Sequence, residues 1–207
     1  MILNIEKGRS GMEIYGDDRS GNCLKVRWTS DLLGLPYVWH EVLALTGQTA
    51  EPGFRALNPF GEVPVVRLAD GNTLAQSNAI ILYLAEGSRL IPQDRFLRAK
   101  MFEWLFWEQY SHEPVIAVRR AKVHLLGLSE AEIDPSLLPR GAKVLTRMQE
   151  HLSQHAFFVG ADLTLADIAL LPYTRFADQG GFELMRYPAI QRWIKRCESI
   201  LDLPALA

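Results

Sequence analysis

Residues 58–86, NPFGEVPVVRLADGNTLAQSNAIILYLAE, constrain the fold of this chain more than any other segment. They contain a short apolar run that opens with Val-Pro, then an Asp-Gly pair, then a Gln-Ser pair in front of an apolar helical pattern. Proline has no N–H to donate, so Pro64 is expected at the first position of a strand. Asp-Gly is the strongest signal for a two-residue hairpin turn. The segment predicts a hairpin of Val63–Leu68 with Asn72–Ala75, followed by a helix over 77–87.

The same features also suit a ligand clamp. X-Pro bonds are the peptide bonds that adopt cis at low cost, and a cis bond at Val63-Pro64 would turn the N–H and C=O of Val63 toward a peptide-like ligand. Gln76 and Ser77 stand where the helix begins, and the N–H groups of a helix start attract carboxylates. The alternative is a plain hairpin followed by a helix with Ser77 as its N-cap. The combination favours the clamp.

Composition excludes several classes of function. The chain has 207 residues, enough for one large domain or two small ones with a buried core. Its net charge of −2 predicts no binding to nucleic acid, and no apolar run approaches the roughly 20 residues that span a bilayer. Cys23 and Cys197 match no metal or disulfide spacing. We therefore predict a cytoplasmic protein without a metal.

Strand and helix patterns alternate in the first half of the chain. Met12–Tyr15 predicts a strand, residues 21–34 a helix, and Tyr37–Leu43 a half-buried strand. A looser polar segment over 46–58 precedes the hairpin. The order β-α-β and then β-β-α, with the last two strands antiparallel, is a thioredoxin-like α/β arrangement.

Strand patterns end at the segment 88–96. Residues 97–124 form one long helical pattern, which Pro114 is expected to kink. Further helices are predicted over 130–156, 164–180 and 188–200. Thr164 and Asp167 form the pattern of a capping box at a helix start. The second half is therefore predicted to be all-α.

The predicted organisation has four parts. A second methionine, Met12, stands where the first strand begins, so the residues before it are either a short extension or the result of a start assigned too early. The parts are an N-terminal extension over 1–11, a thioredoxin-like ligand-binding domain over 12–87, a linker over 88–96 and an all-helical domain over 97–207.

The turn after the first strand carries the candidate reactive group. Ser20-Gly21-Asn22-Cys23 occupies the place where thioredoxin-like proteins carry Cys-x-x-Cys, so exchange by a paired dithiol is excluded there. The hydroxyl of Ser20 can instead donate a hydrogen bond to a ligand thiolate, with Asn22 as a second donor. The alternatives are an N-cap for Ser20 and a simple turn position for Asn22. Cys23 is either an inert packing thiol or the partner of a mixed disulfide.

These motifs resemble the glutathione-binding half of the cytosolic glutathione S-transferases, and the resemblance extends over almost the whole chain. It implies a cis Val63-Pro64 pair whose Val63 backbone holds the cysteinyl part of glutathione, and a Gln76-Ser77 pair that holds the γ-glutamyl carboxylate. It also implies a serine-type active site at Ser20 and a homodimer. Glutathione would be the co-substrate and a small hydrophobic electrophile the acceptor.

One position departs from the family. Several serine-type relatives carry Lys directly before the Val-Pro pair, where it meets the glycyl carboxylate of glutathione, whereas this chain has Glu62. A carboxylate there repels that end of the ligand unless it points away. Thr49 and Arg55 are the predicted substitutes. Glutathione would otherwise bind weakly, or a modified thiol tripeptide would be preferred.

Two residues of the helical half are candidates for the electrophile site. Tyr110 is predicted to line its wall, and His112, similar in place to a beta-class histidine, to polarise the acceptor or the sulfur. For both, packing or exposure to solvent is the alternative. The basic run of Arg119, Arg120 and Lys122 is interpreted as a solvated helix face, with a ligand carboxylate as the alternative.

Simple energetics support thiolate stabilisation at Ser20. Lowering a thiol pKa from about 8.5 by about two units requires roughly 2.7 kcal/mol. A hydrogen bond to a charged group contributes about 1.5–3 kcal/mol, and a helix N-terminus adds about 0.3–1 kcal/mol. The sequence therefore predicts a glutathione transferase. The alternatives are a glutathione-dependent disulfide reductase or peroxidase, and a non-catalytic interaction module.

Overall fold

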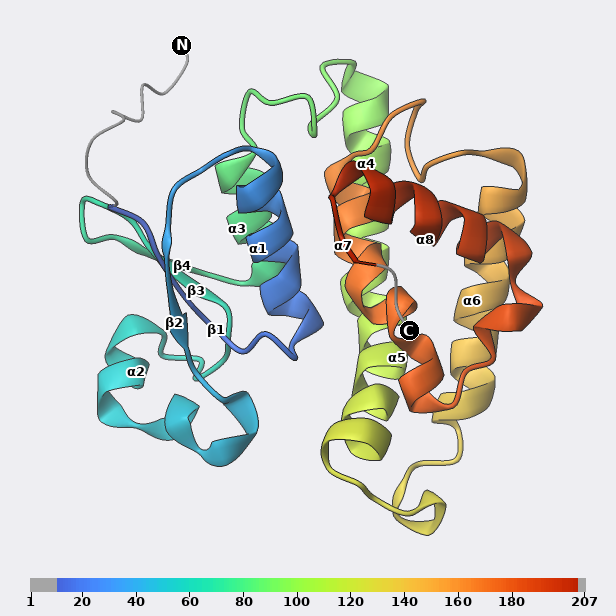
Figure 1. The fold of residues 1–207 in the computed structure, drawn as a ribbon, viewed down its shortest axis with the longest axis horizontal. Helices are drawn as coiled ribbons and strands as arrows, with labels where there is room; N and C mark the ends of the chain where they lie inside the picture. The colour runs from blue at the N-terminus through green and yellow to red at the C-terminus, as the bar shows by residue number, and fades with distance from the viewer. Residues whose placement is uncertain (1–10, 205–207) are drawn as a thin grey trace. The chain divides into compact units, whose positions relative to one another are not determined.

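The computed structural model describes residues 11–204, which divide into two compact units, one ending at Ile91 and the other beginning at Pro92 (Figure 1). This boundary lies inside the segment 88–96 that the sequence indicated as a linker. The predicted extension over 1–11 lies outside the described residues, except for Gly11.

The first unit is built on a sheet of four strands in the order β2-β1-β3-β4. Its strands are β1 (Glu13–Gly16), β2 (Val38–Glu41), β3 (Val65–Arg67) and β4 (Thr73–Ala75), and its helices are α1 (Gly21–Leu32), α2 (Pro52–Leu57) and α3 (Ser77–Leu84). β1 and β2 pair in parallel, whereas the β1–β3 and β3–β4 pairs are antiparallel. This topology confirms the predicted thioredoxin-like arrangement.

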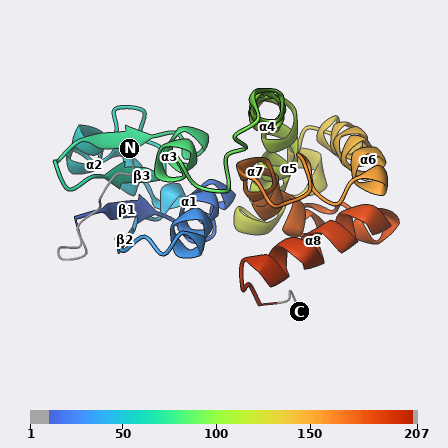
Figure 2. The same cartoon turned by 90° about the horizontal axis from the view of Figure 1, so that it is seen from above.

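Side chains of the sheet alternate between two faces, as strand geometry requires. Ile14 and Val66 are register partners, and both are buried. The neighbouring pair, Tyr15 and Val65, packs with Phe54 of α2. Figures 1 and 2 show α1 and α3 together beside the sheet, with α2 on the other side. The starts of α1 and α3 therefore lie within one unit, beside the same sheet.

The hairpin forms as predicted. The N–H of Leu68 donates to the carbonyl of Asn72 at 2.8 Å, so the loop has the three residues that the predicted strand bounds leave, not the two of the usual Asp-Gly turn. Gly71 has a φ of +87°, the left-handed conformation that closes a three-residue loop. The segment over 46–58 also differs, because it contains the short helix α2.

Within the described residues, every regular element of the second unit is helical. The helices are α4 (Arg95–Trp107), α5 (Glu113–Arg120), α6 (Leu137–Gln154), α7 (Leu165–Arg175) and α8 (Pro188–Ile200). Every residue of α7 is buried, so this helix forms the centre of the unit. The predicted all-α second domain is confirmed.

A π-helical turn interrupts the long helical stretch just before Pro114, where the sequence predicted a kink. A π-helical turn over Glu108–His112 separates α4 from α5. Proline cannot donate to the helix ladder, and both proline and single π-helical turns are known causes of irregularity in a helix. A second π turn, Ala121–Leu125, ends this helical stretch.

The capping box at the start of α7 is confirmed. The N–H and hydroxyl of Thr164 donate to Oδ2 of Asp167 at 3.0 and 3.1 Å. Oδ1 of the same carboxyl accepts the N–H of Phe158 at 3.0 Å and the indole N–H of Trp193 at 2.9 Å. One buried carboxyl thus joins the helix start to the preceding loop and to α8.

The interpretation of the basic run as a solvated face is wrong for two of its members. Arg119 and Arg120 are only 3% and 6% exposed. The Arg119 guanidinium donates to the carbonyl of Gly180 at 2.8 Å and to Glu130 at 2.6 Å. Nε of Arg120 donates to Gln179 at 2.7 Å. Both cations tie α5 to the segment that follows α7.

Candidate functional site

The peptide bond between Val63 and Pro64 is cis, as predicted. Pairing between β3 and its neighbours begins at Val65, so the backbone of Val63 lies outside the described ladder. Pro64 is buried, whereas Val63 is half-buried and packs against the cluster around Phe54. The backbone of Val63 therefore lies just before β3, next to a buried Pro64.

Gln76 and Ser77 stand at the start of α3, where the sequence placed them. Gln76 is the N-cap residue and has a φ of +70°, a conformation that favours glycine. Ser77 is the first helical residue and is 5% exposed. A helix start presents N–H groups and a partial positive charge, which suit a carboxylate.

A hydrogen bond connects this helix start to the turn that carries Ser20. The hydroxyl of Ser77 donates to Oδ1 of Asn22 at 3.0 Å. Asn22 lies in the first turn of α1, two residues after Ser20. The structure therefore gives the side-chain oxygen of Asn22 a partner in α3, and it brings the two predicted halves of the site together.

The hydroxyl of Ser20 does not cap the helix amides. Ser20 is the N-cap residue of α1 but makes no side-chain capping hydrogen bond. Its side chain instead forms a hydrogen bond with the thiol of Cys23. The hydroxyl can rotate about its C–O bond, so a charged sulfur brought by a ligand would compete well for its proton.

Cys23 is a packing thiol. Its side chain has 0% exposure, and its sulfur accepts the N–H of Asp17 at 3.4 Å. Burial raises the pKa of Cys23 to about 12, although the hydrogen bonds from Ser20 and Asp17 oppose the shift. Because only the thiolate is a nucleophile, this residue is not suited to thiol chemistry.

Glu62 makes contact with the predicted carboxylate-binding residue. Its carboxylate accepts Nε2 of Gln76 at 3.2 Å. Its carbonyl accepts Nδ2 of Asn58 at 2.7 Å, and Asn58 is only 2% exposed. The loop before the cis bond is thus held by a buried amide, and the side chain of Glu62 is directed toward Gln76.

The two predicted substitutes for the missing lysine lie on the segment before this loop. Thr49 is half-buried in a short 3₁₀ turn, Gln48–Ala50. Arg55 is exposed on α2, and its guanidinium donates to the carbonyl of Pro59 at 2.7 Å. Arg55 therefore supports the loop in this structure.

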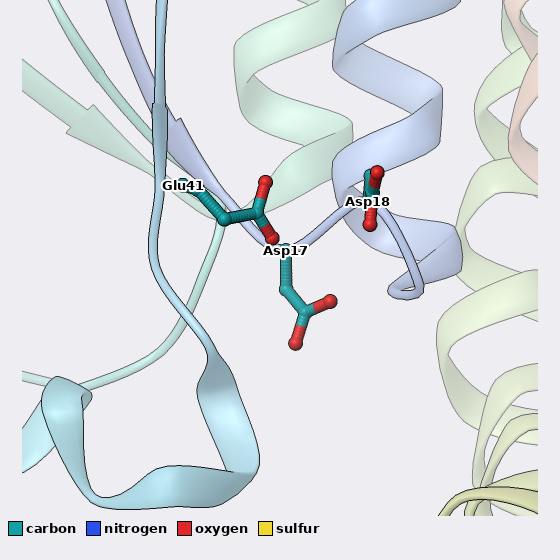
Figure 3. A group of neighbouring side chains, drawn as sticks. All are labelled: Asp17, Asp18 and Glu41. Carbon is teal, nitrogen blue, oxygen red and sulfur yellow. The ribbon is translucent and has the colours of Figure 1, made fainter.

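Three carboxylates gather beside β1 and β2. Asp17, Asp18 and Glu41 place one oxygen each within 4.8 Å of the others (Figure 3). Asp17 is 3% exposed, and its oxygens accept N–H groups from the backbone and guanidinium of Arg19 and from the backbone of Ala44. Burial acts against ionisation, but these donors hold the pKa of Asp17 below its usual value. We assign this carboxylate to anchoring the loop after β1.

The two residues predicted for an electrophile site are not brought together on one surface. Tyr110 is 86% exposed. His112 has 0% exposure, and its Nε2 lies 2.9 Å from the hydroxyl of Thr174 in α7. The contact corresponds to the alternative of a core-packed histidine.

Comparison with known proteins gives the family. The profile described as glutathione S-transferase, N-terminal domain, matches residues 19–86, and the profile for the C-terminal domain of the same family matches residues 110–200. A solved glutathione S-transferase from Pseudomonas fluorescens is 46% identical, with a TM-score of 0.91, over 96% of this chain and 100% of that one. The chain belongs to the glutathione S-transferase family.

Two further relatives of this chain carry different names. Glutathione S-transferase 3 of Zea mays is 32% identical over 78% of this chain and 77% of its own. The disulfide-bond oxidoreductase YghU of Escherichia coli is 29% identical over 72% of this chain and 56% of its own. Family membership therefore fixes the fold but leaves the reaction to be argued from the site. Among residues 11–204, no helix combines the length and apolar content needed to cross a bilayer.

The sequence did not single out Lys25 or Asn58, both of which are buried near the site. Asn58 precedes the Val-Pro pair within the most informative segment, so its position was a usable signal. Lys25 lies one helical turn after Asn22, on the same helix face. Its burial depends on the packing of α1 against α3, which no local pattern encodes.

Proposed function

We propose that this chain is a glutathione transferase that stabilises the glutathione thiolate with the hydroxyl of Ser20. The observation that carries the proposal is the hydrogen bond from Ser77 to Asn22, because it connects the turn of Ser20 to the start of α3. A thiolate stabiliser and a carboxylate anchor then belong to one hydrogen-bonded assembly.

In this proposal the first unit holds glutathione at three places. The γ-glutamyl carboxylate binds at Gln76 and Ser77. The backbone of Val63, directly before the cis bond to Pro64, binds the cysteinyl part. The glycyl end lies toward Thr49, while Glu62 orients the amide of Gln76.

The thiol of the bound glutathione then loses its proton to solvent, and the hydroxyl of Ser20 donates a hydrogen bond to the resulting thiolate. The charge on sulfur is also favoured by the N-terminus of α1, and Asn22 keeps this turn in place. The thiolate attacks the electrophile, a sulfur–carbon bond forms, and the leaving group departs with its electron pair. Tyr110 offers an exposed aromatic surface for a hydrophobic acceptor. His112 is buried against Thr174 and has no part in this scheme.

Two matched variants test the assignment. Conjugation of glutathione to an aryl halide should fall about 100-fold in kcat/KM for Ser20→Ala, which corresponds to about 2.7 kcal/mol of lost transition-state stabilisation. Cys23→Ala should retain most of the activity, because the thiol is buried and protonated. Loss of turnover only in the cysteine variant would overturn the proposal.

The second candidate is a glutathione-dependent disulfide reductase, which the similarity to YghU favours. A bound glutathione thiolate would attack a glutathione mixed disulfide, giving oxidised glutathione and the released thiolate. Because Cys23 is buried, all the reacting sulfur atoms would come from glutathione and the mixed disulfide, and no thiol of the protein would take part. Comparing rates with a mixed disulfide and with an aryl halide separates the two activities.

A further inference from the structure

An acidic side chain stands beside the start of α3. Glu62 and Gln76 are both exposed, and the carboxylate of Glu62 accepts Nε2 of Gln76 at 3.2 Å. The backbone of Glu62 is held from the interior, because the buried amide of Asn58 donates to its carbonyl at 2.7 Å. The loop before the cis bond therefore presents a carboxylate next to the N-cap residue of α3.

The same helix start is the proposed site of the γ-glutamyl α-carboxylate. The first N–H groups of a helix have no partner within it, and they favour an anion. The hydroxyl of Ser77 gives its proton to Asn22, so the ligand carboxylate is bound by these backbone N–H groups and by the amide of Gln76. Nε2 of Gln76 carries two protons and donates one of them to Glu62. Glu62 and the ligand carboxylate then lie on either side of one amide group.

Two negative charges at such short range repel each other unless a cation lies between them. The γ-glutamyl group supplies that cation, because its α-carbon carries an ammonium beside the carboxylate. An ionised carboxylate can accept about four hydrogen bonds, and Gln76 uses one of those of Glu62. A helix start for the carboxylate and an acidic side chain for the ammonium together match both charges of the γ-glutamyl group.

We propose that Glu62 binds the ammonium of the γ-glutamyl group and makes the site selective for thiol peptides with a free α-amino group. This inference rests on the proposed function. It gives a role to the position at which the chain departs from its serine-type relatives. The carboxylate of Glu62 is directed toward Gln76, which is the γ-glutamyl end of the proposed site, and not toward the glycyl end.

The test compares three ligands and two variants. The ligands are glutathione, glutaryl-cysteinyl-glycine, which lacks only the α-amino group, and the glycyl ethyl ester of glutathione, which lacks the charge at the other end. Glu62→Gln removes the charge of the side chain and keeps its size. Glu86→Gln, an exposed position just beyond the other end of α3, is the control. Calorimetry measures each affinity, and thermal melting of each variant reports folding.

We expect Glu62→Gln to bind glutathione about tenfold more weakly than the parent does, which corresponds to about 1.4 kcal/mol. Loss of the α-amino group should weaken binding about tenfold in the parent and only about twofold in Glu62→Gln. The ethyl ester should respond to the substitution as glutathione does, because its ammonium is unchanged. Glu86→Gln should bind all three ligands as the parent does.

Failure of the inference is distinguishable from failure of the proposed function. If the parent binds neither glutathione nor its ester at millimolar concentration, the proposed function is wrong. If the parent binds glutathione but loss of the α-amino group has the same effect in the parent and in Glu62→Gln, the inference about Glu62 is wrong. Tighter binding of glutathione, but not of its ester, by Glu62→Gln would also overturn it, because Glu62 would then act on the glycyl carboxylate.

Discussion

At the scale of single residues, the site depends on side chains whose surroundings differ from those of ordinary surface positions. Ser20 caps a helix without bonding its amides, Gln76 holds a positive φ, and Cys23 is enclosed. Residue types could be read from the sequence, but their burial could not. The serine in place of a redox cysteine was visible in the motif, whereas the buried lysine beside it was not.

Cys23 should be unreactive in the folded protein. With a pKa of about 12, roughly one thiol in ten thousand is ionised at pH 8. Native protein should resist a thiol reagent, and denatured protein should label at both cysteines. The pKa of the Cys23 thiol is higher in the folded protein than in the unfolded chain. The free energy of unfolding should therefore fall as the pH rises from about 8.5 toward 12. Rapid labelling of the native thiol would contradict this assignment.

Gln76 should be replaceable by glycine at little cost to folding. Its φ of +70° is strained for a residue with a Cβ, by about 1–3 kcal/mol, whereas glycine adopts it freely. Gln76→Gly should therefore be more stable than Gln76→Ala, although both lose the amide that contacts Glu62. Denaturant unfolding of the pair measures the difference, and an alanine variant as stable as the glycine variant would exclude strain.

At the scale of elements, the sequence predicted correctly those helices and turns that are marked by cap or turn residues at fixed spacing, and it missed those without such residues. The hairpin and the capping box of α7 carry turn and cap residues at fixed spacing, and both are present. The helix α2 was missed because its six residues lie in a segment rich in polar and turn-forming residues. Pro at its first position was the available start signal. Arg119 and Arg120 were misread because their partners, Gly180 and Gln179, lie some 60 residues away in the chain.

The start of α7 should be a point of high sensitivity in the second unit. Asp167→Ala would leave the N–H groups of Phe158 and Thr164 and the indole N–H of Trp193 without their acceptor. A buried donor without a partner costs about 1–3 kcal/mol, so we expect a loss of at least about 3 kcal/mol in the free energy of unfolding.

A second capping box provides the matched control for that experiment. Ser129 and Glu132 form the same pattern on an exposed 3₁₀ turn, Glu130–Glu132. Glu132→Ala should barely change the midpoint of denaturant unfolding, because water replaces the lost contacts. Equal effects of the two substitutions would show that the buried partners of Asp167 add nothing.

At the scale of the whole molecule, the chain is a glutathione S-transferase family member with two units of different class. The first unit combines the cis bond, the start of α3 and the turn of Ser20, and it carries all the residues proposed to bind glutathione. The end of the strand patterns after the first half of the sequence was sufficient to predict a thioredoxin-like part followed by an all-α part. The acceptor was not predictable, because the resemblance lies in the glutathione-binding motifs and the helical unit offers only one exposed candidate, Tyr110, of the two predicted.

The most direct test of the central claim is the pKa of the glutathione thiol when bound. It is obtained by following the ultraviolet absorption of the thiolate against pH, for the parent protein and for Ser20→Ala at saturating glutathione. The pKa of a free thiol is about 8.5. We predict that the pKa of bound glutathione is about two units lower in the parent protein and returns toward the free value in the Ser20→Ala variant. An unshifted thiol in the parent, or the same lowered pKa in both proteins, would contradict the account.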